Sequence, residues 1–202
     1  MKRIISTVLA LSMLLVSSVV SAGAVSAQTS DPELRFDGHT EYVVVDDKSV
    51  SYNSYAVGTS RFVLVTEDGL STLIEFDDTS GAIYVDGRNI VSHMDTVNGI
   101  ALKDNWGPEH SEVTKTDIVG LSVSVVAALI VGYYSGWNGA AMDIAQIVVS
   151  EGIPALYFKT ITQYNYVDYS PKVGYRLTEE LHKGPACNSS TLLLRRTMNG
   201  SR

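Results

Sequence analysis

One stretch of this 202-residue chain constrains its fold more than any other, because 25 consecutive residues, Ile118 to Met142, carry no charge. The first part, Ile118 to Tyr134, is dense in Val, Leu, Ile and Ala, interspersed with Gly and Ser. A helix needs about 20 apolar residues to cross a bilayer, and a run as diluted as this one is also typical of a buried core helix. The stretch must therefore be enclosed, by protein or by lipid.

The spacing of residues in this region predicts a pair of apolar helices over residues 118–153. Asp117 can cap the start of the first helix. Gly132 and Gly136 have the G-x-x-x-G spacing that lets helix backbones approach closely. Trp137 begins a turn, and Ala140 to Ser150 has apolar residues at helical spacing. If the hairpin acts on a membrane, we expect its active surface to consist of Leu121, Val125, Leu129, Gly132, Gly136, Trp137, Ile144 and Val148.

The acidic region of residues 28–92 has the pattern of an antiparallel β meander with five or six short strands. Arg61 to Thr66 is rich in β-branched and aromatic residues, and Leu70 to Phe76 follows it. The intervening Asp68-Gly69 is a hairpin-turn signal, because both residues tolerate a positive φ. Asp86-Gly87 gives the same signal further along the chain.

Three further segments complete the expected organisation. Residues 93–117 have little periodicity and contain breakers at Asn98-Gly99 and Trp106-Gly107-Pro108, so we expect a linker. Residues 154–180 are rich in tyrosine and predict a β hairpin, and residues 181–202 read as a polar tail. The expected fold class is α+β: an N-terminal antiparallel meander, an apolar helical hairpin and a C-terminal β hairpin.

The N-terminus has the pattern of an export signal over residues 1–27. Met1-Lys2-Arg3 is a short basic segment, an apolar run follows to Val20, and Val25-Ser26-Ala27 resembles a cleavage site. We expect cleavage after Ala27, with Val20-Ser21-Ala22 as a second candidate. The mature protein is thus expected to be secreted, and the short basic segment together with a single cysteine suits a Gram-positive source.

The charge of the chain is unevenly distributed. The whole chain has a formal charge of −7, but residues 28–118 have a balance of −11 and residues 119–202 a balance of +2. An acidic chain lacks the basic face that nucleic acids require, so no nucleic-acid partner is expected. The asymmetry indicates two physical roles in one chain.

The sequence contains no recognisable catalytic motif. His110 stands between Glu109 and Glu112, but no second histidine follows at ligand spacing. Asp77-Asp78 occurs where a turn favours aspartate, and Cys187 has no setting that would activate its thiol. We therefore expect a non-enzymatic protein with no cofactor and no metal. A hydrolase that uses His110 and the neighbouring acids remains the third hypothesis.

The order of segments carries a family resemblance. The signal at Met1 to Ala27, the apolar hairpin at Ile118 to Ser150 and the Tyr-rich hairpin at Leu156 to Tyr175 resemble large, unmodified secreted bacteriocins of bacilli, the geobacillin type. The resemblance concerns architecture and carries over no catalytic residue. It implies an antibacterial protein that acts on related Gram-positive cells.

Two functional hypotheses lead from these observations. The first is a secreted antibacterial protein acting on the membrane or envelope of target bacteria, with an immunity protein as a further partner. The second is a secreted binding or envelope-associated β protein, in which the helices serve only as core. The sequence leaves the oligomeric state open, and the first hypothesis predicts that the apolar hairpin is buried in the soluble form.

Overall fold

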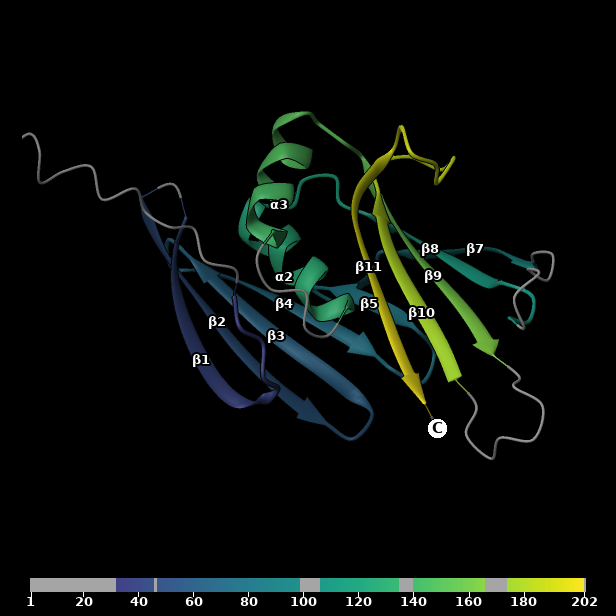
Figure 1. Cartoon of the computed structure of the whole chain (residues 1–202). Helices are drawn as coiled ribbons and strands as arrows, with labels where there is room; N and C mark the ends of the chain where they lie inside the picture. The colour runs from purple at the N-terminus through teal and green to yellow at the C-terminus, as the bar shows by residue number, and fades with distance from the viewer. Residues whose placement is uncertain (1–31, 46, 99–105, 135–139, 166–173, 202) are drawn as a thin grey trace, which may run out of the picture.

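The computed structural model describes residues 32–45, 47–98, 106–134, 140–165 and 174–201. Two antiparallel β-sheets lie on either side of a pair of short helices (Figure 1). The expected α+β class is therefore confirmed, with strands making up most of the regular structure. The expected signal peptide with Ala27, and the turn residues Gly136 and Trp137, lie outside the described residues.

Both sheets are meanders, in which strands that follow one another in the sequence are neighbours. The N-terminal sheet consists of β1 (Asp37–Val45), β2 (Lys48–Val57), β3 (Ser60–Glu67), β4 (Leu70–Asp77), β5 (Ala82–Val85) and β6 (Arg88–Asn89). The C-terminal sheet consists of β7 (Val91–Asn98), β8 (His110–Asp117), β9 (Ala155–Asn165), β10 (Gly174–His182) and β11 (Leu192–Ser201). The helices α2 (Val123–Tyr133) and α3 (Ala141–Ser150) are inserted between β8 and β9.

The N-terminal sheet matches the expected meander closely. Asp68 and Gly69 have φ angles of 52° and 77°, and the register pairs Glu67 with Leu70 across a two-residue turn. Asp86 and Gly87 repeat this geometry, with φ angles of 50° and 76°. The favoured hairpin turn needs a positive φ at both central positions, which Asp-Gly supplies at little cost.

Alternate residues of the N-terminal sheet form one apolar face. The side chains on this face are almost fully buried and include Val43, Val45, Val50, Tyr52, Val63, Val65, Ile74, Phe76, Ile83 and Val85. The opposite face is open to solvent, where Tyr42 and Val44 are exposed. This period of two is the pattern of a sheet with one dry face and one wet face.

The helix pair packs on that dry face and on the inner face of the C-terminal sheet. The first helix begins after Ser122, whose side chain accepts a hydrogen bond from the Val125 backbone N–H. Asp117, the expected cap, instead ends β8, because its backbone N–H donates to the Ile90 carbonyl. Ile90 also donates to Ile83, so this one residue joins the edges of the two sheets.

The segment expected to be a linker, residues 93–117, differs most from the sequence analysis. It contains most of β7 and all of β8, which pair with each other and place β8 beside β9. Val113, Thr114 and Thr116 are β-branched, and both threonines are buried on the inner face. Because threonine counts as polar in a hydropathy pattern, a buried strand with alternating threonines resembles a loop.

The prediction of a polar tail over residues 181–202 is also corrected by the structure. It contains the end of β10 and the whole of β11, which pairs with β10 along its length and forms an edge of the sheet. The expected C-terminal hairpin, residues 154–180, is therefore the middle of a five-stranded sheet. An edge strand can carry many charged and polar side chains, which concealed this strand in the sequence.

Candidate functional site

The helix α2 is the most enclosed element among the described residues, and it holds three of the eight expected site residues, Val125, Leu129 and Gly132. Nine of its residues, from Ser124 to Gly132, are buried, and none of its residues is charged. The expected residues Val125, Leu129, Ile144 and Val148 are buried in the one core that fills the space between the sheets. Leu121 is partly buried beside them, so the structure brings these residues together as core.

Gly132 makes a close approach to an aromatic ring of the N-terminal sheet. A Cβ atom placed on Gly132 would lie 2.6 Å from Cε2 of Phe76, which is buried on β4. The three atoms nearest to that position all belong to the Phe76 ring, and the expected helix–helix contact at Gly132 stays a prediction. The requirement for a residue without a side chain remains, because the ring occupies that space.

The C-terminal end of α2 is held by Arg61 of β3. The Nη1 atom of Arg61 donates to the Gly132 carbonyl at 2.7 Å, and its Nη2 lies 2.7 Å from Oδ1 of Asp78. The guanidinium also lies over the rings of Phe36 and Phe76, at 5.1 and 5.2 Å from their centroids. A cation at this end of a helix is favourable, because free carbonyl groups gather there.

Two adjacent tyrosines connect α2 to the C-terminal sheet. The ring of Tyr133 stacks on Phe158 of β9, with the centroids 4.2 Å apart. The hydroxyl of Tyr134 lies 3.1 Å from the carbonyl oxygens of Lys159 and Glu180, to which it donates. Burial raises the pKa of both tyrosines, so both hydroxyls remain protonated at neutral pH and act as donors.

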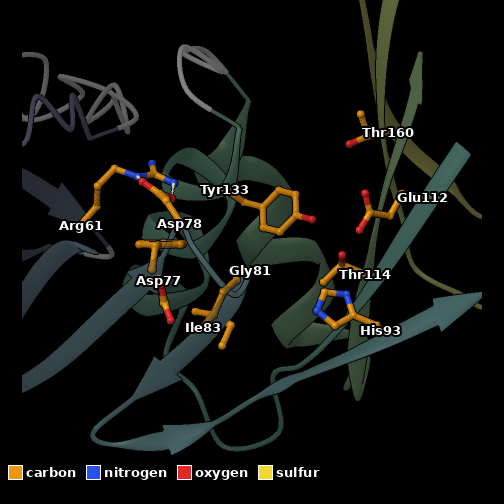
Figure 2. A pocket seen from close by; sticks show the side chains of 12 residues that line it. Arg61, Asp77, Asp78, Gly81, Ile83, His93, Glu112, Thr114, Tyr133 and Thr160 are labelled. Atoms are coloured by element: carbon orange, nitrogen blue, oxygen red, sulfur yellow. Dashed lines mark hydrogen bonds and ion pairs between the residues drawn. The ribbon is translucent and has the colours of Figure 1, made fainter. Parts of the chain in front are cut away.

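A cleft of about 210 Å³ lies beside Tyr133, between the two sheets (Figure 2). Arg61 and Asp78 form one side of it, and Glu112, Thr114 and Thr160 form the other. The hydroxyl of Tyr133 points toward Thr114 and Glu112 in this view. The cleft is therefore lined by charged side chains of both signs and by the aromatic ring of Tyr133.

Two acidic residues of the cleft, Asp77 and Asp78, are used by the fold. Asp77 accepts hydrogen bonds from the backbone of Thr79 and from the backbone and hydroxyl of Ser80, and the bond from the Ser80 hydroxyl is the largest cause that lowers its pKa. Asp78 is engaged by Arg61. The two carboxylates thus stabilise the turn and the helix end, as the turn interpretation of Asp77-Asp78 predicts.

The two acids of the hydrolase hypothesis line different cavities. Glu112 lines the cleft between the sheets, whereas Glu109 lines a trough on the outer face of the C-terminal sheet. Within the part of the chain that the structure describes, no three His, Cys, Asp or Glu side chains form a group that could hold a metal ion. The acids on either side of His110 thus line different cavities.

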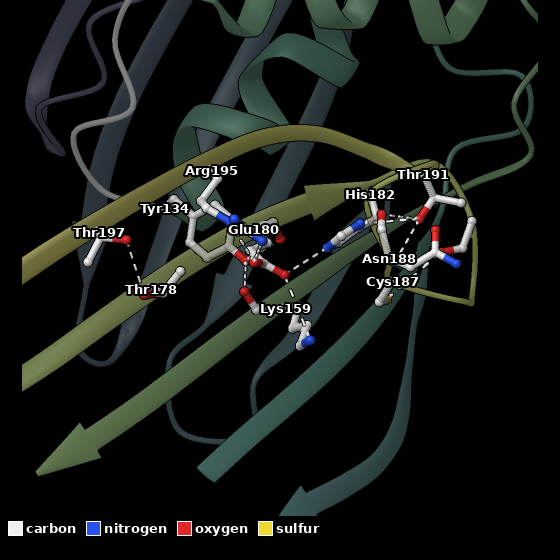
Figure 3. Close-up of polar contacts among 11 residues, drawn as sticks. Tyr134, Lys159, Thr178, Glu180, His182, Cys187, Asn188, Thr191, Arg195 and Thr197 are labelled. Carbon is white, nitrogen blue, oxygen red and sulfur yellow. Dashed lines mark hydrogen bonds and ion pairs between the residues drawn. The ribbon is translucent and has the colours of Figure 1, made fainter. Parts of the chain in front are cut away.

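A buried polar cluster occupies the other end of the C-terminal sheet (Figure 3). The carboxylate of Glu180 is almost fully buried and receives Nε of Arg195 at 2.7 Å, while Nε2 of His182 lies 3.0 Å away. Burial by itself raises the pKa of Glu180, but the hydrogen bonds from His182 and Arg195 and the charge of Lys159 outweigh burial, so its pKa is lowered. Glu180 is therefore ionised at neutral pH.

The loop between β10 and β11 closes over this cluster. Nδ1 of His182 lies 3.2 Å from Oγ1 of Thr191, and that hydroxyl donates to the Asn188 carbonyl. Burial raises the pKa of the Cys187 thiol in the same loop, which disfavours the reactive thiolate. The cluster fastens the loop to the sheet, and Cys187 is a bystander in it.

Sequence reasoning identified the apolar residues of this site and missed its polar ones. Glu180 and His182 alternate on β10, but Arg61 on β3 and Arg195 on β11 join the helix end and the cluster, respectively, only in the folded chain. One signal was present in the sequence. Two adjacent acids, Glu179-Glu180, and two adjacent arginines, Arg195-Arg196, stand in separate polar segments, and opposite charges are typical of cross-strand neighbours.

The length of the helices bears on membrane action. Neither helix among the described residues is long and apolar enough to cross a membrane.

Comparison of the chain with models of protein families, with curated proteins and with solved structures gives no match.

Proposed function

We propose that this chain is a secreted antibacterial protein that acts at the envelope or membrane of related Gram-positive bacteria. The single observation that carries the proposal is the enclosure of α2, a helix that is apolar on every side, between two sheets. A helix of this kind needs an apolar environment on all sides, which either a protein core or a lipid phase supplies. Enclosure keeps such a segment soluble until the target is reached.

Few polar contacts hold α2 between the sheets. On the N-terminal side, Arg61 donates to Gly132 and the Tyr52 hydroxyl donates to the Ser124 carbonyl at 3.4 Å. On the C-terminal side, Tyr134 donates to two carbonyl groups of β9 and β10. Separation of the sheets would break these contacts and expose the apolar helix. The partners of such a protein are the target envelope and an immunity protein in the producing cell.

Two exposed apolar side chains next to the helices would meet a membrane first. Val119 precedes α2 and is 66% exposed, and Ile147 lies on the solvent side of α3 and is 46% exposed. The segment that contains Val119 lies against the end of α3, around Gly152 and Ile153. Exposed apolar groups at one end of a helix pair favour contact with an apolar surface.

Killing and leakage assays test this proposal directly. Purified protein is applied to lawns of related Gram-positive bacteria and to dye-loaded vesicles of anionic phospholipid. We expect killing, with dye release if the membrane is the target. Protein that neither kills cells nor releases dye, before or after limited proteolysis, contradicts the proposal.

Matched variants locate the contact surface. Val119→Asp and Ile147→Asp place a charge on the helix end without entering the core, and we expect both to weaken killing. Val57→Asp makes the same change at an exposed position of the N-terminal sheet and serves as control. Equal loss in all three variants would show that added charge, and not position, is responsible.

A specific observation also favours the second function, a secreted envelope-binding β protein. The helix α2 has 11 residues, and a helix of that length rises about 16 Å, roughly half of the hydrocarbon thickness of a bilayer. In this alternative, the helices remain core and a sheet surface makes the contact. Binding to isolated cell envelopes, together with blank killing and leakage assays, would select it.

A further inference from the structure

The outer face of the C-terminal sheet, turned away from the helices, carries a polar trough of about 420 Å³. Residues of β9, β10 and β11 cross it in rows, because the register pairs Arg176 with both Gln163 and Asn199. The next row toward the loop contains Thr178 and Thr197, whose hydroxyls lie 3.2 Å apart (Figure 3). The complete lining is Glu109, Ile161, Gln163, Arg176, Thr178, Glu180, Arg195, Thr197 and Asn199.

The two ends of the trough differ in how their charges are used. At the loop end, Glu180 is engaged by Arg195 and His182. At the opposite end, Arg176 has no carboxylate within ion-pair distance among the residues described. Its guanidinium lies over the ring of Trp106, 4.4 Å from the centroid. Stacking uses the flat face of the guanidinium and leaves the N–H groups at its edge available to a planar oxyanion.

An unpaired amide group lies beside this arginine, and a second unpaired amide lies further along the same strand. Gln163 is only 3% exposed, and its Nε2 has no hydrogen-bond partner within the described chain. Oδ1 of Asn165, two residues further along β9, is also buried without a partner there. Buried polar groups are nearly always satisfied, so the unpaired donor of Gln163, which lines the trough, indicates a missing partner that accepts a hydrogen bond.

We propose that this trough binds an anionic saccharide, that is, a sugar unit carrying a carboxylate or a phosphate group. The oxyanion lies against the edge of Arg176. The sugar hydroxyls meet the amide of Gln163, the threonine hydroxyls and the carboxylate of Glu109 at the rim. The mixture of donors and acceptors matches a hydroxylated ligand. A bare anion would be repelled by the carboxylates of Glu109 and Glu180. The inference goes beyond the proposed function, because it concerns a surface remote from the helices and does not depend on killing.

Titration of the purified protein tests the proposal with four probes: glucuronate, glucose 6-phosphate, glucose and inorganic phosphate. The readout is NMR, followed at the Arg176 side-chain Nε–H and the Gln163 side-chain amide. We expect saturable shifts of both signals with glucuronate or glucose 6-phosphate, and the stronger of the two identifies the oxyanion. Glucose and inorganic phosphate should each bind more weakly, because each lacks one half of the recognised chemistry.

Three variants separate the trough from general charge effects. Arg176→Gln should raise the Kd roughly tenfold or more, because a charge-assisted hydrogen bond is lost. Gln163→Leu keeps the shape, removes the amide and should also raise the Kd. Lys115→Gln makes the same charge change on β8 outside the trough, and its Kd should stay within about twofold of the wild type, since exposed charges are screened. Circular dichroism and the thermal midpoint confirm that each variant is folded.

Several results would overturn the proposal. Absence of shifts with all four probes would do so, as would an equal loss of affinity in Arg176→Gln and Lys115→Gln. Binding of inorganic phosphate as tight as that of glucose 6-phosphate would show a simple anion site, and binding of glucose as tight as that of glucuronate would exclude a role for charge. None of these results bears on antibacterial activity, which the lawn and vesicle assays measure separately.

Discussion

The two sheets enclose the same helices but differ in how many polar side chains they bury. Among the described residues, the N-terminal sheet buries one polar side chain, Ser54, within an otherwise apolar face. The C-terminal sheet buries six polar or charged side chains: Thr114, Thr116 and Glu179 on the helix side, and Gln163, Glu180 and His182 on the outer face. The first sheet is therefore a packing surface, and the second depends on specific partners for its buried groups.

This difference has a physical consequence for function. A buried charge is tolerated only when partners compensate its desolvation, as Arg196 does for Glu179 with Nη2 2.6 Å from the carboxylate. A sheet built in this way already positions charged and amide groups, which a polar ligand can use. An apolar sheet provides enclosure but no recognition. We therefore expect ligand contacts on the C-terminal sheet, and the largest losses of stability from substitutions on the N-terminal side.

The largest effect should come from Gly132, where α2 meets the N-terminal sheet. Gly132→Leu places a side chain in the space of the buried Phe76 ring, so we expect the free energy of unfolding to fall by at least about 3 kcal/mol. Chemical denaturation followed by circular dichroism measures this loss. If killing is lost as well, the folded fraction decides whether the helix or the fold is responsible.

A second pair of variants tests the assignment to Phe76. Gly132→Ala should cost much less in a Phe76→Leu background than in the wild type, since the smaller side chain leaves room. An equal cost in both backgrounds would mean that the ring does not limit the residue at position 132. The N-terminal sheet would then pack against α2 less tightly than the contrast between the two sheets implies.

On the C-terminal sheet, the next largest effect should come from Glu180. Glu180→Gln removes the charge while keeping the shape, and we expect the free energy of unfolding to fall by about 2 kcal/mol, because the charge-assisted bonds from Arg195 and His182 are weakened. Glu151→Gln breaks an exposed pair with Lys183 at 3.0 Å and should cost less than about 0.5 kcal/mol. Similar losses in the two variants would remove the contrast between buried and exposed charges.

The two sheets also differ in how far the sequence predicts them. The N-terminal meander follows from alternating apolar residues and from Asp-Gly turns, which are local signals. In the C-terminal sheet, Thr114 and Thr116 are polar by composition but buried in the fold, and β11 carries its charges on an edge. Neither property is local, because each depends on which strand becomes a neighbour.

The candidate site shows the same division. The burial of Leu129 and Val148 follows from hydrophobic spacing, as the sequence predicts. The role of Gly132 does not, because Phe76 lies 56 positions away in the sequence and only the fold brings them together. Arg61 at the end of α2 is hidden for the same reason. Local patterns thus predict which residues are enclosed, and tertiary pairing decides which partners enclose them.

The pH dependence of stability should report the charge of Glu180. Its pKa is lowered in the folded protein, so the folded state binds fewer protons than the unfolded state and the stabilisation is present above the ordinary value of 4.5. As the pH falls below that value, the stabilisation should be lost progressively. Wild type and Glu180→Gln should therefore converge in free energy of unfolding on acidification, as urea titrations at a series of pH values would show. A constant difference down to strongly acidic pH would mean that the Glu180 charge does not contribute.

The smallest effect should come from Tyr134, the residue through which α2 is tied to the C-terminal sheet. Tyr134→Phe keeps the buried ring and removes the donor to the Lys159 and Glu180 carbonyls, so we expect a loss of about 1 kcal/mol in urea denaturation. Tyr42→Phe, at a position 73% exposed on β1, should leave the free energy of unfolding unchanged within error.

The Tyr134→Phe measurement distinguishes a polar contact from packing alone as the interaction that holds α2 on the C-terminal sheet. If Tyr134→Phe is destabilising and Tyr42→Phe is not, the C-terminal sheet binds the helix through a polar contact in addition to packing. If both are silent, packing against Phe158 is sufficient, and the C-terminal sheet encloses α2 in the same way as the N-terminal sheet. The contrast between the sheets would then be confined to the outer trough and the Glu180 cluster, where no helix is involved.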